Sequence, residues 1–224
     1  MRLRVKLPKS KCMWGFFWVL MLYLPLPALA DVEQAFVALH QKDYPSAYKL
    51  FLESAQAGNA EAEYNLGVLI HGGQGTEKDE TQALSWIEKA AVQGWADAQY
   101  YLGNLYEFGQ IVPQSFQNAA LWYQKAAEQG NASAQTNLAV LYANGQGVNQ
   151  DIVLAYVWSN LAASQGIVEA LQNRETVAAE MSPEMLKRVR AVSKEYFQKY
   201  VAPFQSQQSL RPGGMRSLPP PEQQ

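Results

Sequence analysis

The residue types that most often carry out chemistry are few in this chain, and their spacing does not suit a reaction. Its two histidines, His40 and His71, have no second histidine or carboxylate at a metal-ligand spacing such as His-x-x-x-His. Ser133, Ser159 and Ser164 lack the histidine and aspartate context that activates a nucleophile. We therefore expect no metal, no cofactor and no catalytic residue, and we predict that the protein is not an enzyme.

Glycine-rich stretches are the other pattern that could indicate chemistry. Gly73-Gln-Gly75 and Gly145-Gln-Gly147 have glycine spacing that suggests phosphate binding. No strand is predicted before either of them, although a phosphate-binding loop requires that context. Because the same stretch recurs, we interpret it as a linker between helices.

Small and aromatic residues recur along the chain at a fixed step of 36 residues. The step is kept by four alanines, four glycines and three tryptophans: Ala47, Ala83, Ala119 and Ala155; Gly58, Gly94, Gly130 and Gly166; Trp86, Trp122 and Trp158. A repeat of this length is typical of stacked helical arrays, in which each unit buries its apolar face against its neighbours. Such arrays present a long surface to a partner and rarely build a deep catalytic pocket.

Each unit contains two apolar stripes at helical spacing. In the unit 96–130, one stripe runs from Ala98 to Tyr106 and the other from Ala119 to Ala126. A glycine in mid-helix costs about 1 kcal/mol relative to alanine, so Gly103 indicates close approach of two helices. The tryptophans recur on the second stripe, which favours a core position over an exposed stack for a carbohydrate or peptide.

The repeated string is Ala-x-Ala-Glu/Gln-x-x-Leu-Gly/Ala-x-Leu, then Gly-x-Gly-Val, then Ala-x-x-Trp-x-x-x-Ala-Ala-x-x-Gly, and it covers residues 60–166. It resembles the Sel1-like repeat, a relative of the tetratricopeptide repeat, in bacterial exported proteins. The resemblance implies an all-α fold, a right-handed α-solenoid of helix-turn-helix units. We expect about ten helices from Val32 to about Tyr200.

The same comparison of units divides the chain into segments. We expect a signal peptide at 1–30, a tetratricopeptide-like helix pair at 31–59, three repeats at 60–94, 96–130 and 132–166, a degenerate repeat with a capping helix at 167–202, and a disordered Pro/Gln-rich tail at 203–224. Arg174 stands where the three repeats have leucine, which marks the degenerate unit. Ser182 and Pro183 have the residue types that begin a helix.

The first 30 residues have the composition of a targeting segment. Five basic residues precede an apolar run from Met13 to Leu24, and Ala28-Leu29-Ala30 forms an A-x-A cleavage site. We expect cleavage before Asp31 and a location in the periplasm or outside the cell. The alternative is an inner-membrane anchor at 12–30, although the apolar run is short for a span of about 20 residues. Residues 31–224 contain no cysteine.

Charge is distributed unevenly. Residues 31–180 contain 6 basic and 17 acidic residues, whereas residues 181–224 contain 7 basic and 3 acidic ones. Phosphate backbones require a basic stripe, so the acidic array argues against nucleic acid as a partner.

The family resemblance also implies a binding surface, because the first helix of each pair lines the concave groove in tetratricopeptide-like arrays. The groove-facing positions would be Glu61, Tyr64, Asn65, Val68 and His71 in the first unit, Asp97, Tyr100, Tyr101, Asn104 and Glu107 in the second, and Ser133, Thr136, Asn137 and Val140 in the third. None of them is Lys or Arg, so we expect a protein or peptide partner with basic residues. Tyr100 and Glu107 should be exposed and the tryptophans largely buried. For Tyr101 the alternative is packing between helices.

We therefore predict a non-enzymatic scaffold or adaptor of the cell envelope that binds a protein or peptide in its groove. One alternative is a hydrolase acting on cell-wall material or β-lactams, an activity ascribed to cysteine-rich relatives. The absence of cysteine after Ala30 weighs against that alternative. The other alternative is a component of an envelope machine, such as a flagellar motor or a polysaccharide-export complex.

Overall fold

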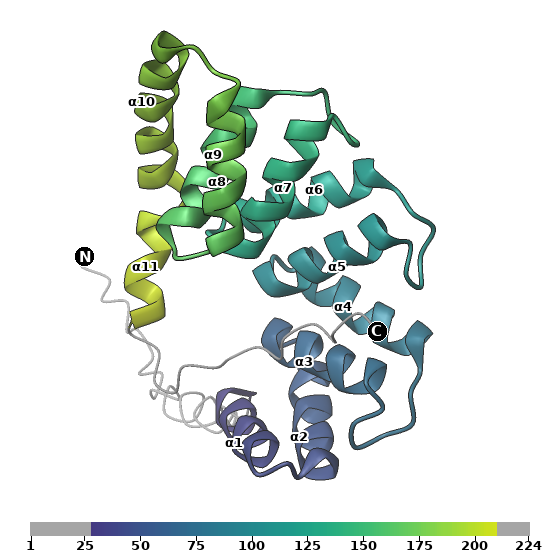
Figure 1. Cartoon of the computed structure of the whole chain (residues 1–224). Coiled ribbons are helices and arrows are strands. Elements are labelled where there is room, and N and C mark those ends of the chain that lie inside the picture. Colours follow the sequence, from purple (N-terminus) through teal and green to yellow (C-terminus); the bar gives the residue numbers. More distant parts are fainter. Residues whose placement is uncertain (1–27, 210–224) are drawn as a thin grey trace, which may run out of the picture.

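The computed structural model describes residues 28–209, which form eleven α-helices and no strand. The helices are α1 (Ala28–His40), α2 (Tyr44–Gln56), α3 (Ala60–His71), α4 (Glu80–Val92), α5 (Ala96–Phe108), α6 (Phe116–Ala127), α7 (Ala132–Asn144), α8 (Ile152–Ser164), α9 (Val168–Ala179), α10 (Pro183–Tyr200) and α11 (Ala202–Ser209). They follow one another side by side in a curved array (Figure 1). The predicted all-helical solenoid is confirmed, with α1 to α10 as the ten expected helices.

The two ends of the chain lie outside the described residues. These are residues 1–27, which include most of the predicted signal peptide, and residues 210–224 of the predicted tail. Helix α1 begins at Ala28 and therefore includes the predicted cleavage site. Export and cleavage stay predictions.

The second helix of each pair begins at a capping side chain that recurs at the 36-residue step. Asp43, Asp79, Ser115 and Asp151 precede α2, α4, α6 and α8. Each side-chain oxygen accepts a hydrogen bond from a first-turn backbone N–H, at 2.9–3.3 Å. These bonds satisfy N–H groups that have no partner within the helix, so the sequence itself fixes where each second helix starts.

The loops between paired helices need a left-handed backbone at one shared position. Gly75 and Gly147 have φ of 76° and 71° there. A Cβ on Gly75 would lie 2.3 Å from the Tyr44 carbonyl oxygen, so this loop touches the preceding unit. The middle unit has Ile111 at this position with φ of 63°, which is unfavourable for a β-branched residue. Its side chain packs against the core cluster formed by α3, α4 and α5, which helps to offset that cost.

A buried ladder of side-chain amides joins successive units. Gln99 of α5 donates to the carbonyl of Ala91 in α4 at 3.0 Å and accepts a bond from Gln129, just after α6, at 2.7 Å. The residues 36 positions further on, centred on Gln135, repeat both bonds at 3.0 and 2.8 Å. One buried amide thereby ties together three consecutive helical segments, with its polar groups hydrogen-bonded.

The first unit has a carboxyl group in place of this amide. Glu63 of α3 is only 4% exposed, and its Oε2 accepts a hydrogen bond from Gln93 at 2.5 Å. Burial raises the pKa of Glu63, and this effect outweighs the opposing influence of Lys89 and of the Gln93 hydrogen bond. An ionised Glu63 cannot donate to the Ala55 carbonyl, which is the counterpart of the bond from Gln99 to Ala91.

The tryptophans of the second helices differ in burial along the array. Trp158 is 4% exposed because Tyr196 and Tyr200 of α10 lie against it, with ring centroids 5.6 and 5.5 Å away. Trp86 and Trp122 are half-buried, and lysine side chains lie over their rings. The predicted burial is therefore confirmed for Trp158 and only partly met by the other two.

The end of the array departs from the regular repeat. Helix α10 packs against α8, and Arg174 of α9 hydrogen-bonds Asn160 instead of filling a leucine position. The prediction of a disordered tail from residue 203 is wrong for residues 203–209, which belong to α11. Phe204 packs against the turn before α7, where a Cβ on Gly130 would lie 3.2 Å from its ring. This apolar contact gives the otherwise polar segment a place to dock.

Replacing Gly103 by alanine should destabilise the fold. The new Cβ would lie 2.5 Å from two ring carbons of Tyr123, and overpacking of this kind costs roughly 1–3 kcal/mol, against a helix-propensity gain of about 1 kcal/mol. Urea denaturation measures the change. In a Tyr123→Ser background, which imitates the Ala139 and Ser159 pair of the third unit, the same alanine should be neutral or stabilising. A stabilised Gly103→Ala single variant would show that the helices do not approach as described.

Replacing Glu63 by glutamine should stabilise the protein at neutral pH. The raised pKa of Glu63 means that ionising it opposes folding, so the wild-type free energy of unfolding falls as pH rises above about 4.5. An amide at this position can also donate to the Ala55 carbonyl, a bond worth about 1 kcal/mol. The advantage of Glu63→Gln should shrink below pH 4.5 in denaturant titrations. Gln99→Glu should instead lower the free energy of unfolding at neutral pH. If the free energies of unfolding of wild type and Glu63→Gln changed in parallel with pH, a raised pKa of Glu63 would be contradicted.

Candidate partner-binding site

The first helices of the three units place the predicted groove residues in two different environments. Eight are half-buried with part of the side chain at the surface: Glu61, His71, Asp97, Tyr100, Glu107, Ser133, Asn137 and Val140. Six are buried: Tyr64, Asn65, Val68, Tyr101, Asn104 and Thr136. The expectation that all of these positions face an open groove is wrong for the buried six. The expectation that Tyr100 and Glu107 are exposed is also wrong, since both are half-buried.

Packing between neighbouring first helices explains the burial. The rings of Tyr64 in α3 and Tyr101 in α5 meet edge to face with centroids 6.4 Å apart, and His71 meets Tyr101 in the same way at 6.3 Å. Tyr101 thus packs between helices, the alternative left open by the sequence. Burial, together with the charge of Lys78, lowers the pKa of His71, so its imidazole is neutral at neutral pH.

A connected group of polar side chains lies between α5, α6 and α7; we call it the Tyr123 cluster and define it as Tyr100, Asn104, Glu107, Tyr123 and Asn137. The Tyr123 hydroxyl lies 2.5 Å from both Asn104 Oδ1 and Glu107 Oε2. Asn137 of α7 donates to Asn104 Oδ1 at 3.3 Å. The Tyr100 ring lies against the Tyr123 ring, with centroids 5.9 Å apart. The cluster thus brings four of the predicted residues together around a tyrosine that was not predicted.

The electrostatics of the cluster centre on the Tyr123 hydroxyl and the Glu107 carboxyl group. Burial raises the pKa of Tyr123 well above its usual range, and the hydrogen bond to Glu107 and its charge act in the same direction. Tyr123 therefore remains a neutral donor, with one hydroxyl hydrogen for two acceptors. The ion pairs within the described residues are Lys78–Glu80, Arg174–Glu175 and Arg188–Glu184, so no described lysine or arginine pairs with Glu107.

The other units lack this polar cluster. At the position of Asn104 they have Val68 and Val140, and at the position of Glu107 they have His71 and Ala143. Tyr123 is replaced by an isoleucine in the first unit and a serine in the third. Because these units stack without the cluster, helix packing does not require it. In the sequence, Tyr123 could have been recognised because the middle unit differs from the other two at three aligned positions, those of Asn104, Glu107 and Tyr123. Residues shared by all units do not reveal such a difference.

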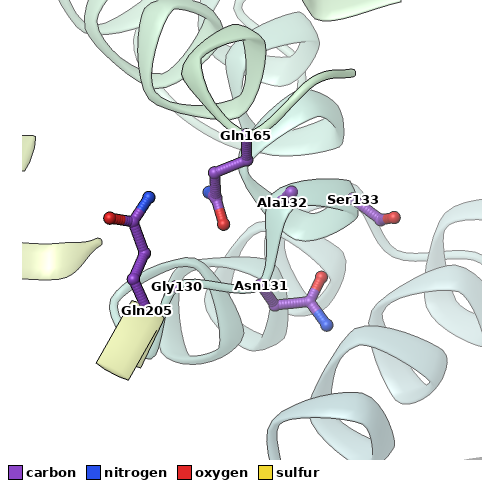
Figure 2. A pocket seen from close by; sticks show the side chains of 6 residues that line it. All are labelled: Gly130, Asn131, Ala132, Ser133, Gln165 and Gln205. Atoms are coloured by element: carbon purple, nitrogen blue, oxygen red, sulfur yellow. The ribbon is translucent and has the colours of Figure 1, made fainter. Parts of the chain in front are cut away.

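A separate pocket of about 360 Å³ lies where α11 approaches the start of α7. Gly130, Asn131, Ala132, Ser133, Gln165 and Gln205 line it, and Figure 2 shows Gln205 opposite the Gln165 and Asn131 side chains. Its side chains offer amides and one hydroxyl, with no acid, base or thiol. The pocket has polar contacts to offer but no group of the kind that performs general acid–base catalysis.

Residues 28–209 contain neither a metal-binding group nor a membrane-spanning helix. No group of three or more His, Cys, Asp or Glu side chains is placed to hold a metal ion there. Over the same residues, no helix combines the length and apolar character needed to cross a bilayer.

With the geometry established, comparison with known proteins decides the family. The Sel1 repeat model matches residues 40–59, 60–95, 96–131 and 132–167, more than half of the chain. The chain belongs to the Sel1 repeat family. Proteins built from Sel1 repeats are generally scaffolds for protein–protein interaction.

Solved structures include relatives of this Sel1 repeat protein. A Sel1 repeat protein from Oxalobacter formigenes is 33% identical, with a TM-score of 0.64, over 68% of this chain and 45% of its own. The protein c5321, described as a protective antigen of uropathogenic Escherichia coli strains with an SLR fold, is 23% identical with a TM-score of 0.42, over 86% of this chain and 58% of its own. The chain thus spans about half the length of these two proteins. No curated protein sequence matches it.

Proposed function

We propose that this Sel1 repeat protein is a non-enzymatic scaffold or adaptor of the cell envelope, and that it binds a protein or extended peptide with basic residues. The binding surface is the first-helix face of α5 and α7. The observation that carries the proposal is the Tyr123 cluster, a polar group on this face with three half-buried members, Tyr100, Glu107 and Asn137, that the stacking of units does not require.

The charge of the first helices supports a basic partner. Helices α3, α5 and α7 contain no lysine or arginine, whereas α3 has Glu61 and Glu63 and α5 has Asp97 and Glu107. Half-buried carboxylates interact with a partner's charge more strongly than fully solvated ones, because the local dielectric constant is lower. Binding should therefore weaken as salt rises, mainly through the more exposed charges.

The envelope location is supported by the composition of the first 30 residues. A basic start, an apolar run and a small-residue cleavage site are typical of an export signal. An array that is held together by hydrogen bonds and apolar burial, with no cysteine after Cys12, is compatible with an oxidising compartment.

Photocrosslinking tests which face binds the partner. A photoreactive amino acid placed at Tyr100, Ser133 or Val140 should give the same crosslinked product in cells, and rising salt should reduce its yield in extracts. Leu121 is the matched control, since it is exposed on α6 away from this face. Crosslinking from Leu121 with none from the three test positions would contradict the proposed surface.

A further inference from the structure

We infer that the Tyr123 cluster binds one arginine side chain of the partner, with Glu107 as the residue that selects it. The inference rests on the proposed function, because it names the chemical group that the α5–α7 face recognises. Glu107 supplies the charge, Tyr123 holds the carboxylate in place, and Tyr100 lies along the path to it.

The bonding of Glu107 leaves room for an incoming cation. Its Oε2 is 2.5 Å from the Tyr123 hydroxyl, and its Oε1 has no hydrogen-bond partner among the described residues. Tyr123 is fully buried, so the bond fixes one end of the carboxylate from inside the protein. Glu107 is half-buried, and no described basic residue forms an ion pair with it. A partner's cation would complete this group.

The shape of the cluster favours arginine over lysine. Tyr100 and Glu107 lie seven residues apart on one face of α5, about 10 Å along the helix axis. A long side chain can place its methylene groups over the Tyr100 ring while its head reaches the carboxylate. A guanidinium group is planar, donates two parallel hydrogen bonds to a carboxylate and stacks on aromatic rings, which a lysine ammonium group cannot match.

A purely structural role for the cluster explains less. The bonds of Tyr123 and Asn137 to Asn104 do connect α5, α6 and α7. The carboxylate of Glu107 is not needed for that connection, because Asn104 Oδ1 lies within hydrogen-bond distance of the Tyr123 hydroxyl and would accept its hydrogen if Glu107 did not. The equivalent position in the third unit is Ala143, and α7 and α8 pack together without a carboxylate there.

Selection from a random peptide library tests the inference while the partner is still unidentified. The purified protein is immobilised, and peptides displayed on phage are selected in parallel against wild type, Glu107→Gln and the control Glu88→Gln, which is exposed on α4. Arginine should be enriched with wild type and with the control, and the enrichment should disappear with Glu107→Gln. Unchanged thermal unfolding of Glu107→Gln verifies that the variant is folded.

The affinity of one selected peptide then separates the chemical alternatives. Glu107→Gln should weaken its binding about tenfold or more, because a charge-assisted pair is lost. Replacing the peptide's arginine by lysine should weaken binding to wild type several-fold, and replacing it by citrulline should weaken it as much as Glu107→Gln does. Selected peptides without arginine, or equal affinity for wild type and Glu107→Gln, would overturn the inference and leave the proposed surface standing. A library that yields no binding peptide would contradict the proposed function itself.

Discussion

The fold depends on joining successive helices, and one buried side chain in each unit provides such a connection. A helical solenoid has no sheet to connect its elements, so successive helices must be joined by side chains. At positions 63, 99 and 135 a buried side chain on the first helix hydrogen-bonds the end of the second helix of its own unit, and the two glutamines also bond the preceding unit. These bonds, together with the apolar burial on either side, fix the spacing of the units. The surface that the first helices present is a consequence of the same arrangement.

The repeat period predicted most of this architecture. Residues that recur at a step of 36 residues defined the units, the glycine-rich linkers and the two helices of each pair. The period did not predict which first-helix residues stay open to a partner. A helical stripe identifies one face of a helix, but the neighbouring helix covers part of that face, as Tyr101 does for Tyr64 and His71. Nor did composition predict α11, because its docking depends on one ring against a turn more than 70 residues earlier in the chain.

In this protein, repeated positions indicate packing, whereas positions that differ in one unit indicate function. Positions that are alike in most units, such as the helix caps and the amide ladder of Gln99 and Gln135, have packing roles. Positions where one unit differs from the others are not required for the packing that all units share. Asn104, Glu107 and Tyr123 differ together in the middle unit and form one hydrogen-bonded group. Their position on α5 and α6, beside α7, puts the proposed recognition site at the centre of the array, between neighbouring units.

The central claim is that the first-helix face of α5 and α7 is the partner surface. Hydrogen exchange measured by mass spectrometry, with and without a saturating arginine-containing peptide selected from a library, tests it most directly. Slower exchange confined to residues 96–108 and 132–144, with residues 183–200 unchanged, is the result that the account predicts. Slower exchange centred on α10 and α11, with α5 and α7 unaffected, would contradict it.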